Sequence, residues 1–169
     1  MKAIFWGLGL ALFLAAAPAV AIENRLGLGV HVWRSAGELW DHPTNGGEHD
    51  LTALLSYQLV LLRPLKLQLD VEYFDNGFGG AGLVALFPQG LIVVGDRLYV
   101  AVGAGWIYPR DLEGNLSNVV YLARLGIDLP VRSRLHLDLY VQQRAEDASR
   151  LTAATAETIT FGTVVRFRM

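Results

Sequence analysis

Hydrophobic and polar residues alternate along most of this chain with a period of two, the period at which side chains reach opposite faces of a β-strand. The segment Leu65–Phe74 shows the pattern most clearly. Leucine, valine and tyrosine fill its odd positions, whereas lysine, glutamine, aspartate, glutamate and phenylalanine fill its even ones. No segment shows a comparable helical period of about 3.6 residues. The pattern therefore predicts an all-β protein.

We predict eight strands, separated by turn sequences such as Asp75-Asn76-Gly77. They cover residues 25–34, 51–61, 65–74, 79–94, 97–108, 118–129, 134–144 and 155–169. The fourth segment contains Pro88-Gln89-Gly90, and proline removes a hydrogen bond from a strand ladder. We interpret 79–94 as one strand with a kink or bulge at the proline, followed by a turn at Gly95-Asp96. The alternative is a turn at the proline and a very long fifth strand.

The predicted connections alternate in length. Those at 34–50, 75–79, 109–117 and 145–154 are long, whereas those at 63–64, 95–96 and 130–133 are short. Outer-membrane β-barrels have an even number of strands, long external loops and short periplasmic turns. The sequence therefore predicts an eight-stranded antiparallel transmembrane up-and-down β-barrel with both termini in the periplasm.

The N-terminal residues have the pattern of a secretory signal peptide. A basic start at Met1-Lys2 precedes an apolar run over 3–17, and Ala19-Val20-Ala21 forms an A-x-A cleavage site. Cleavage after this site divides the chain into a signal peptide at 1–21 and a barrel at 22–169, which reaches the bacterial outer membrane through the periplasm. The alternative is an N-terminal anchor, but the apolar run is short for a helical span of about 20 residues.

Alternation alone does not show which face points outward, and a soluble, lipocalin-like barrel would place the apolar residues inside. Aromatic residues of the apolar faces lie largely toward strand ends, as at Tyr73, Tyr121 and Phe167, which is typical of an interfacial girdle. Glycines recur on the polar faces, where they weaken a solvent-exposed strand but make room inside a narrow barrel. These glycines are Gly27, Gly29, Gly103, Gly105, Gly126 and Gly162. The apolar faces are therefore expected to contact lipid.

The polar faces carry both signs of charge, and unpaired charges in a narrow lumen would be unfavourable. We therefore expect ion pairs and a filled polar lumen rather than a pore. The residues assigned to this lumen network are Arg25, Lys66, Asp70, Glu72, Arg124, Asp128, His136, Asp138, Arg144 and Arg166. His31 and Trp33 are expected to fill the lumen near the outer rim of the first strand.

Composition excludes several functions. Charged residues are 18% of the chain, below the roughly 25% usual in soluble domains, which agrees with a lipid-covered exterior. The net charge of −2 argues against nucleic-acid binding, which requires a basic patch. The chain has no cysteine, so disulfides and thiolate chemistry are impossible. No cofactor is predicted.

The first long loop is rich in carboxylates and histidines. The candidate ligands of a divalent cation in this loop are Asp41, His42, Glu48, His49 and Asp50. These residues match no known metal-ligand spacing, and the alternative is a solvated acidic loop. The other predicted external loops are also acidic, so they are candidates to engage lipopolysaccharide through bridging Ca²⁺ or Mg²⁺, or to bind a basic partner.

The strongest candidate for catalysis is His136 with Asp138, which share the inward face two residues apart, with Ser133 in the preceding turn. The simpler interpretation is a hydrogen-bonded interior histidine. Lipid A deacylases of this barrel type need histidine and serine on a lipid-facing surface, and the predicted lipid faces have neither. We expect a structural or surface-interaction role. An enzyme acting on outer-membrane lipid and a narrow, porin-like channel for small solutes are the alternatives.

The stretch Arg97-Leu98-Tyr99-Val100-Ala101-Val102-Gly103-Ala104-Gly105-Trp106 resembles the Tyr-Val-x-x-Gly-x-Gly-aromatic strand of small OmpA/OmpX-type outer-membrane β-barrels. The final strand, with aromatic residues two positions apart, resembles the C-terminal assembly signal of outer-membrane proteins, although Met169 stands in place of the terminal aromatic residue. The resemblance implies a monomer that is inserted by the barrel assembly machinery and contacts outer-membrane lipids and lipopolysaccharide. It does not imply one activity.

Overall fold

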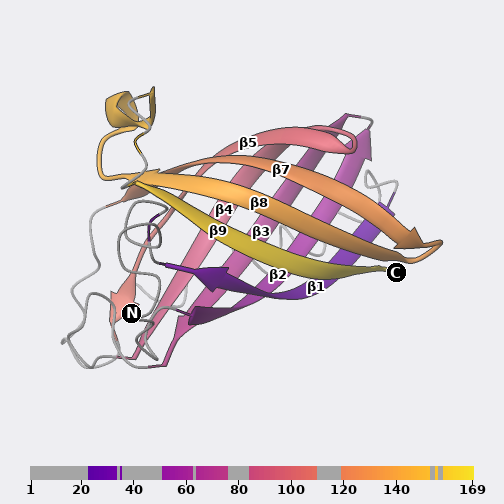
Figure 1. The fold of residues 1–169 in the computed structure, drawn as a ribbon, viewed down its shortest axis with the longest axis horizontal. Helices are drawn as coiled ribbons and strands as arrows, with labels where there is room; N and C mark the ends of the chain where they lie inside the picture. The colour runs from indigo at the N-terminus through magenta and orange to yellow at the C-terminus, as the bar shows by residue number, and fades with distance from the viewer. Residues whose placement is uncertain are drawn as a thin grey trace, which may run out of the picture.

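The computed structural model describes residues 23–33, 35, 51–62, 64–75, 84–109, 119–152, 155 and 158–169. The predicted signal peptide and most residues of the predicted long loops lie outside this part of the chain. Figure 1 shows that the described chain consists almost entirely of β-strands. The elements are β1 (Glu23–Val32), β2 (Leu51–Leu62), β3 (Leu65–Phe74), β4 (Ala85–Gly95), β5 (Leu98–Gly105), β6 (Tyr108–Pro109), β7 (Val120–Arg132), β8 (Leu135–Ala145), the 3-10 helix η3 (Ala148–Thr152) and β9 (Ile159–Arg168).

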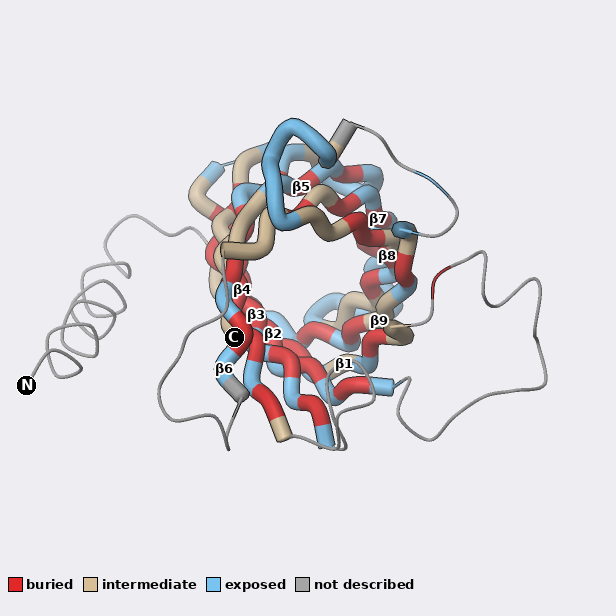
Figure 2. The backbone as a smooth tube through the Cα atoms, turned by 90° about the vertical axis from the view of Figure 1, so that its left-hand side faces the viewer, coloured by how far each residue is buried: buried red, intermediate tan, exposed pale blue. Residues whose placement is uncertain are grey.

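The strands close into a barrel, which Figure 2 shows as a ring. Neighbouring strands pair antiparallel, and β1 also pairs with β9, from Arg25 opposite Arg168 to Val32 opposite Phe161. The pairing of β3 with β4 completes the ring. β6 pairs with β4 in the same register as β5 does, so β6 continues β5. The nine elements therefore occupy eight strand positions around the ring. The predicted eight-stranded, all-antiparallel barrel is confirmed.

Pro88 explains the interruption between β5 and β6. β4 passes through this proline with an unbroken register toward β3, where Val71 lies opposite Pro88. On the other side, the amide of Trp106 donates to the carbonyl oxygen of Pro88 at 3.2 Å, but proline has no N–H with which to return the bond. The prediction of one strand ending at a turn after Val94 is confirmed. The predicted bulge within β4 is wrong, because the interruption falls on the partner strand.

Several other strand boundaries differ from the prediction. β4 begins at Ala85 rather than at residue 79, and β7 covers Val120–Arg132 rather than 118–129. β1 covers Glu23–Val32 rather than 25–34, because its pairing with β2 begins opposite Val60 and ends opposite Leu51. β9 begins at Ile159 rather than at residue 155. Before this strand, the amide of Thr158 donates to the carbonyl oxygen of Thr155 at 3.0 Å.

The connections give the barrel two different ends. The short connections at 63–64, 96–97 and 133–134 lie at the end that also holds Met169 (Figure 1). The connections after β1, β3, β6 and β8 are longer, and the strand ends that they join lie at the opposite end. We call these the short-turn end and the long-loop end. In the turn after β4, Gly95 has a φ of 133°, and a Cβ there would lie 2.3 Å from the carbonyl oxygen of Leu98, so the turn requires glycine.

The helix η3 follows β8 at the long-loop end. The carboxylate of Asp147 accepts a hydrogen bond from the amide of Ser149 at 2.9 Å. The backbone carbonyl oxygen of Asp147 accepts one from the amide of Arg150 at 3.0 Å. The bond from the Ser149 amide lowers the pKa of the Asp147 carboxyl. Within the described part of the chain, no helix is long and apolar enough to cross a membrane.

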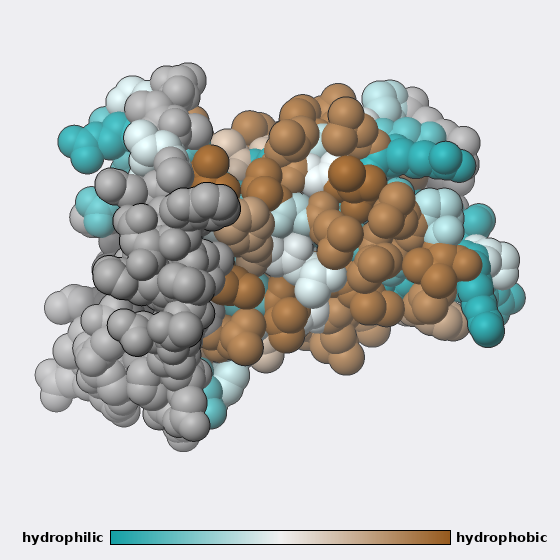
Figure 3. Space-filling view, in the orientation of Figure 1, coloured by the Kyte–Doolittle hydropathy of each residue, from teal (hydrophilic) through white to brown (hydrophobic). Residues whose placement is uncertain are grey.

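The barrel has a largely polar interior and an apolar exterior. Charged side chains such as Asp138 and Arg166 are 0% and 1% exposed, whereas Leu28 and Leu98 are 69% and 65% exposed. On the face that Figure 3 shows, the apolar side chains form a broad belt across the middle of the barrel. Hydrophobic residues also occupy part of the interior, where they pack between the polar groups.

Glycines on the inward face make room for tyrosine rings of neighbouring strands. Gly126 on β7 lies opposite Tyr99 on β5, and a Cβ at this glycine would lie 2.4 Å from the tyrosine hydroxyl oxygen. Gly162 on β9 has the same relation to Tyr140 on β8, where the Cβ would lie 2.2 Å from the ring carbon Cζ. Both tyrosines are buried, so these two glycines have the packing role that the sequence predicted.

Replacing Gly126 with alanine is expected to lower the free energy of unfolding by about 1–3 kcal/mol. The added methyl group would displace the Tyr99 ring, whose hydroxyl is held by Asp138 at 2.8 Å. Gly90→Ala is the matched control, because a Cβ there meets only Leu69 Cδ2, at 3.9 Å on the outward face. Urea titration of the folded protein in detergent, read by gel mobility, measures both variants. Equal stability of the two variants would contradict the packing role.

Candidate functional site

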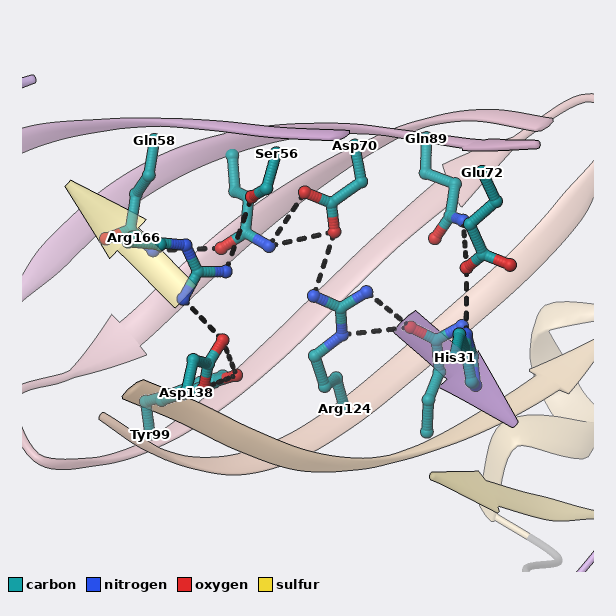
Figure 4. Close-up of polar contacts among 12 residues, drawn as sticks. His31, Ser56, Gln58, Asp70, Glu72, Gln89, Tyr99, Arg124, Asp138 and Arg166 are labelled. Atoms are coloured by element: carbon teal, nitrogen blue, oxygen red, sulfur yellow. Dashed lines mark hydrogen bonds and ion pairs between the residues drawn. The ribbon is translucent and has the colours of Figure 1, made fainter. Parts of the chain in front are cut away.

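The barrel interior holds the candidate site. The ten residues that the sequence assigned to the lumen all occupy inward-facing positions, and their contacts divide them into three groups along the barrel. The short-turn group contains Arg25, Lys66, Asp128 and His136, the central group contains Asp70, Arg124, Asp138 and Arg166, and the long-loop group contains Glu72 and Arg144. Figure 4 shows the residues of the central group and their neighbours pointing toward one another from different strands.

Asp128 on β7 is the centre of the short-turn group. Arg25 reaches it from β1, with Nη1 donating to Oδ2 at 2.6 Å, and His136 Nδ1 lies 2.8 Å from Oδ1. The ammonium of Lys66 on β3 lies 3.5 Å from Oδ2. Glu23 supplies a second carboxylate, 2.5 Å from Nε of Arg25. The group therefore links β1, β3, β7 and β8 through two carboxylates.

An ion pair between Asp138 on β8 and Arg166 on β9 forms one half of the central group. The Tyr99 hydroxyl lies 2.8 Å and 3.0 Å from the two oxygens of the same carboxylate. Nη2 of Arg166 is within 3.4 Å of the Ser56 hydroxyl. The two charged side chains are almost completely buried, so each depends on the other for neutralisation.

Arg124 on β7 forms the other half of the central group. Its Nη1 donates to Asp70 Oδ2 at 2.9 Å, and its Nε and Nη2 donate to the amide oxygen of Gln142 at 2.9 Å and 2.7 Å. Asp70 also accepts from Gln68 Nε2 at 2.9 Å. The guanidinium carbon of Arg124 lies 3.9 Å from the centre of the Tyr140 ring, a favourable cation–π distance. This arginine thus fills the space between β3, β7 and β8.

Glu72 on β3 organises the long-loop group. Its carboxylate accepts from Gln89 Nε2 at 2.6 Å and from Trp33 Nε1 at 2.9 Å, and His31 Nδ1 lies 2.9 Å from Oε1. Arg144 Nη2 on β8 lies 3.1 Å from Oε2, and its guanidinium carbon lies 3.2 Å from the centre of the Trp33 ring. The carboxylate therefore has partners from β1, β4 and β8 as well as from the residue following β1.

The line Thr160, His31 and Glu72 resembles a nucleophile, base and orienting carboxylate in order, since His31 Nε2 lies 2.9 Å from the Thr160 hydroxyl. The hydroxyl, however, donates its single proton to the carbonyl oxygen of Gln142 at 3.0 Å. In this arrangement the hydroxyl proton points to the Gln142 carbonyl oxygen and not to His31 Nε2. All three side chains are buried, so this line serves to hold β1, β3 and β9 together.

An apolar cluster occupies the interior beside the long-loop group. It packs residues of β3, β4, β7 and the β5–β6 junction against one another: Phe74, Ala85, Phe87, Ile107 and Leu122, with Trp33 and Val120 at its edge. The Trp33 ring meets Phe74 edge-on at a centroid distance of 4.7 Å. This cluster reduces the interior space toward the long-loop end.

The ion pairs of the interior link different strands to one another. Arg25 joins β1 to β7, Arg124 joins β7 to β3, Arg144 joins β8 to β3, and Arg166 joins β9 to β8. A solute passing along the barrel would have to break several of these pairs, and a buried ion left without its partner is strongly unfavourable. The arrangement is suited to rigidity and closure.

The metal-binding prediction falls outside the described residues, which do not include Asp41, His42, Glu48, His49 or Asp50. Within the described ranges, no group of three or more histidine, aspartate or glutamate side chains is arranged to hold a metal ion.

The proposed pairing of His136 with Asp138 does not occur. His136 bonds to Asp128 across the β7–β8 ladder, whereas Asp138 bonds to Arg166 and to Tyr99. Asp128 and Asp138 lie directly opposite each other in that ladder, and different cations neutralise them. Sequence spacing placed the two residues on one face, but the choice of partner came from neighbouring strands.

Several network residues were not assigned a role from the sequence. Those with contacts to the charged groups or to His31 include Glu23, Thr52, Ser56, Gln68, Gln89, Tyr99, Gln142 and Thr160. Glu23, Gln68, Gln142 and Thr160 share the even–odd phase of the inward charged residues in their own strands. β2, β4 and β5 contain no charged residue, and there the network residues share the phase of the buried positions. That phase was the available signal. His31 and Trp33, which the sequence identified as lumen fillers, lie in the long-loop group.

Comparison with known proteins supports the fold. No protein-family model matches this chain, and no curated protein matches its sequence. Among solved structures, Neisserial surface protein A superposes with a TM-score of 0.51 and 11% identity over 87% of this chain and 97% of that protein. A de novo designed transmembrane β-barrel superposes with a TM-score of 0.48 and 15% identity over 86% of this chain and 95% of the design. The chain is thus a closed eight-stranded antiparallel β-barrel, the architecture of Neisserial surface protein A.

Proposed function

We propose that this protein is an integral β-barrel of the bacterial outer membrane, with a side-chain-filled lumen and a structural or surface-interaction role. The observation that carries the proposal is the distribution of exposure. Large apolar side chains on every long strand are exposed, while buried ion pairs occupy the interior. Water would make such an exterior unstable and prone to aggregation, whereas hydrocarbon solvates it.

Aromatic side chains support the same assignment. Tyr73, Trp106 and Tyr108 are 41%, 43% and 47% exposed near the long-loop end, and Phe167 is 52% exposed near the short-turn end. Aromatic rings at both ends of an apolar band are typical of membrane-spanning barrels, and tyrosine and tryptophan prefer the membrane interface. For the orientation, we propose that the short turns face the periplasm and the long connections face the cell exterior. This is the orientation of the OmpA/OmpX-type barrels that the sequence resembles.

The role follows from which surfaces are left for partners. The interior groups are engaged with one another, and the membrane-facing strands contact lipid. The acidic long connections, together with lipopolysaccharide and bridging divalent cations, would then form the interaction surface. Export as a cleaved precursor, insertion by the barrel assembly machinery and a monomeric state are parts of the same proposal.

The test is the gel mobility of the outer-membrane fraction with and without boiling in detergent. We expect the protein in this fraction and a boiling-dependent shift, because a closed barrel with all strand edges paired resists detergent until it is heated. A soluble periplasmic protein without a shift would contradict the proposal. Its exposed apolar surface would then require a different environment, such as a protein partner.

A further inference from the structure

The short-turn end of the barrel carries exposed arginines that the interior network does not use. Arg97, Arg132 and Arg134 are exposed, and none of their guanidinium groups has an ion pair or hydrogen bond with a described residue. Among the described residues of the same turns, Asp96 is the one exposed carboxylate that offsets these arginines. In Figure 3 hydrophilic surface gathers at this end, beyond the apolar belt. The end therefore has a surplus of positive charge.

Two arginines at this end line one hollow. Ser133, Arg134, Arg168 and Met169 surround a cavity of about 390 Å³. The backbone amide of Arg168 donates to the carbonyl oxygen of Arg134 at 2.8 Å, which holds the end of β9 against the start of β8. The hollow therefore has a fixed frame, from which two guanidinium groups and one hydroxyl can donate hydrogen bonds. We call it the arginine hollow.

The donors of the arginine hollow fit a phosphate. Arginine presents a planar fork that binds phosphate oxygens with two parallel hydrogen bonds, and a serine hydroxyl can add a further donor. Among the described residues, the Arg134 guanidinium has no partner to give up. Arg168 is 3.2 Å from Glu23 Oε2, but its side chain is 51% exposed and can reach a ligand. Glu23 is also bonded to Arg25, so it does not depend on Arg168 alone.

The surface beside the arginine hollow is apolar and exposed. Val131, Phe167 and Met169 are 56%, 52% and 66% exposed, and they adjoin Arg132 and Arg168 in sequence. The apolar belt thus ends where the arginines begin. A ligand that matches both features has a phosphate group next to hydrocarbon, which is the chemistry of a phospholipid.

We propose that the arginine hollow binds the headgroup phosphate of an anionic phospholipid in the membrane leaflet at the short-turn end, with the acyl chains beside Phe167 and Met169. The proposal rests on the proposed function, since the chains need the barrel to lie in a bilayer. In the orientation proposed above, this leaflet is the periplasmic one. Each basic residue near an anionic membrane surface raises the affinity for anionic lipid about fivefold.

The experiment counts lipids retained by the detergent-purified barrel in native mass spectrometry, after addition of equal dioleoylphosphatidylglycerol and dioleoylphosphatidylcholine. We expect the wild type to retain phosphatidylglycerol preferentially. Arg134→Gln is expected to weaken this retention about fivefold, and the double variant with Arg168→Gln about 30-fold. Arg150→Gln, which removes the same charge at the long-loop end, is the control and is expected to retain the preference.

Equal retention of the two lipids by the wild type, or unchanged preference in the double variant, would overturn the proposal. Loss of phosphatidylglycerol on addition of equimolar inorganic phosphate would assign the hollow to a free anion and overturn its assignment to lipid. The boiling shift of each variant reports folding separately. A folded, heat-modifiable barrel without lipid preference disproves this inference alone, whereas a water-soluble wild type disproves the proposed function and this inference with it.

Discussion

Replacing Asp138 with alanine is expected to lower the free energy of unfolding by about 3–5 kcal/mol, one of the two largest effects we predict. The carboxylate is fully buried and pairs with Arg166, which is 1% exposed. Without it, a guanidinium stays in the interior with no compensating charge, and the Tyr99 hydroxyl loses both of its acceptors. Urea titration in detergent, read by gel mobility, gives the change in stability.

A double variant separates the ion pair from the position. Asp138→Leu with Arg166→Met removes both charges, and replacing a buried pair with apolar residues of similar volume is often neutral or stabilising. We therefore expect the double variant to be more stable than Asp138→Ala. Asp75→Ala is the control for loss of an exposed carboxylate, with an expected change within about 0.5 kcal/mol. If Asp138→Ala behaves like this control, the interior pair does not hold the barrel together.

Replacing Leu28 with arginine is expected to destabilise the barrel in lipid vesicles by about 2–4 kcal/mol. Leu28 is 69% exposed in the middle of β1, so the charge would enter the centre of the apolar belt. Leu98→Arg is the matched variant, since Leu98 is 65% exposed beside Arg97 at the short-turn end. There the guanidinium reaches the interface, and the expected loss is about 0–1 kcal/mol.

The comparison of these two variants depends on the environment of the exterior. On a water-exposed surface both arginines would be solvated, and both changes would fall within about 0.5 kcal/mol. A difference that depends on the depth of Leu28 and Leu98 therefore requires a hydrocarbon layer around the barrel. Folding yield and urea midpoint in vesicles measure it, and equal values for the two variants would argue against membrane insertion.

The sequence predicted most strands closely because the side-chain period of a strand is local. Leu65–Phe74 was predicted with the boundaries that the structure shows, and the turn at Gly95 followed from glycine beside aspartate. The prediction was weaker around Pro88. The missing N–H of this proline interrupts the partner strand at Trp106, between β5 and β6, and not β4 itself. A proline marks the lost bond, but only the pairing shows which partner loses it.

The interior contacts were predictable as a set and not as pairs. Alternation placed His136 and Asp138 on one face, and it did the same for Arg25, which lies 103 residues from its partner Asp128. Nothing in the local sequence indicates that His136 turns to Asp128, or that Arg25 crosses from β1 to β7. These choices depend on strand register and on which inward residues face each other across a narrow ring.

The sequence by itself determined the all-β class, the number of strands, and which residues share a face, because each of these follows from a two-residue period and from turn chemistry within a few residues. The tertiary structure decided the partners of the buried charges, the packing of Tyr99 over Gly126, and the arginine hollow between Arg134 and Arg168. Those features join residues of separate strands, and only closure and register bring such residues together.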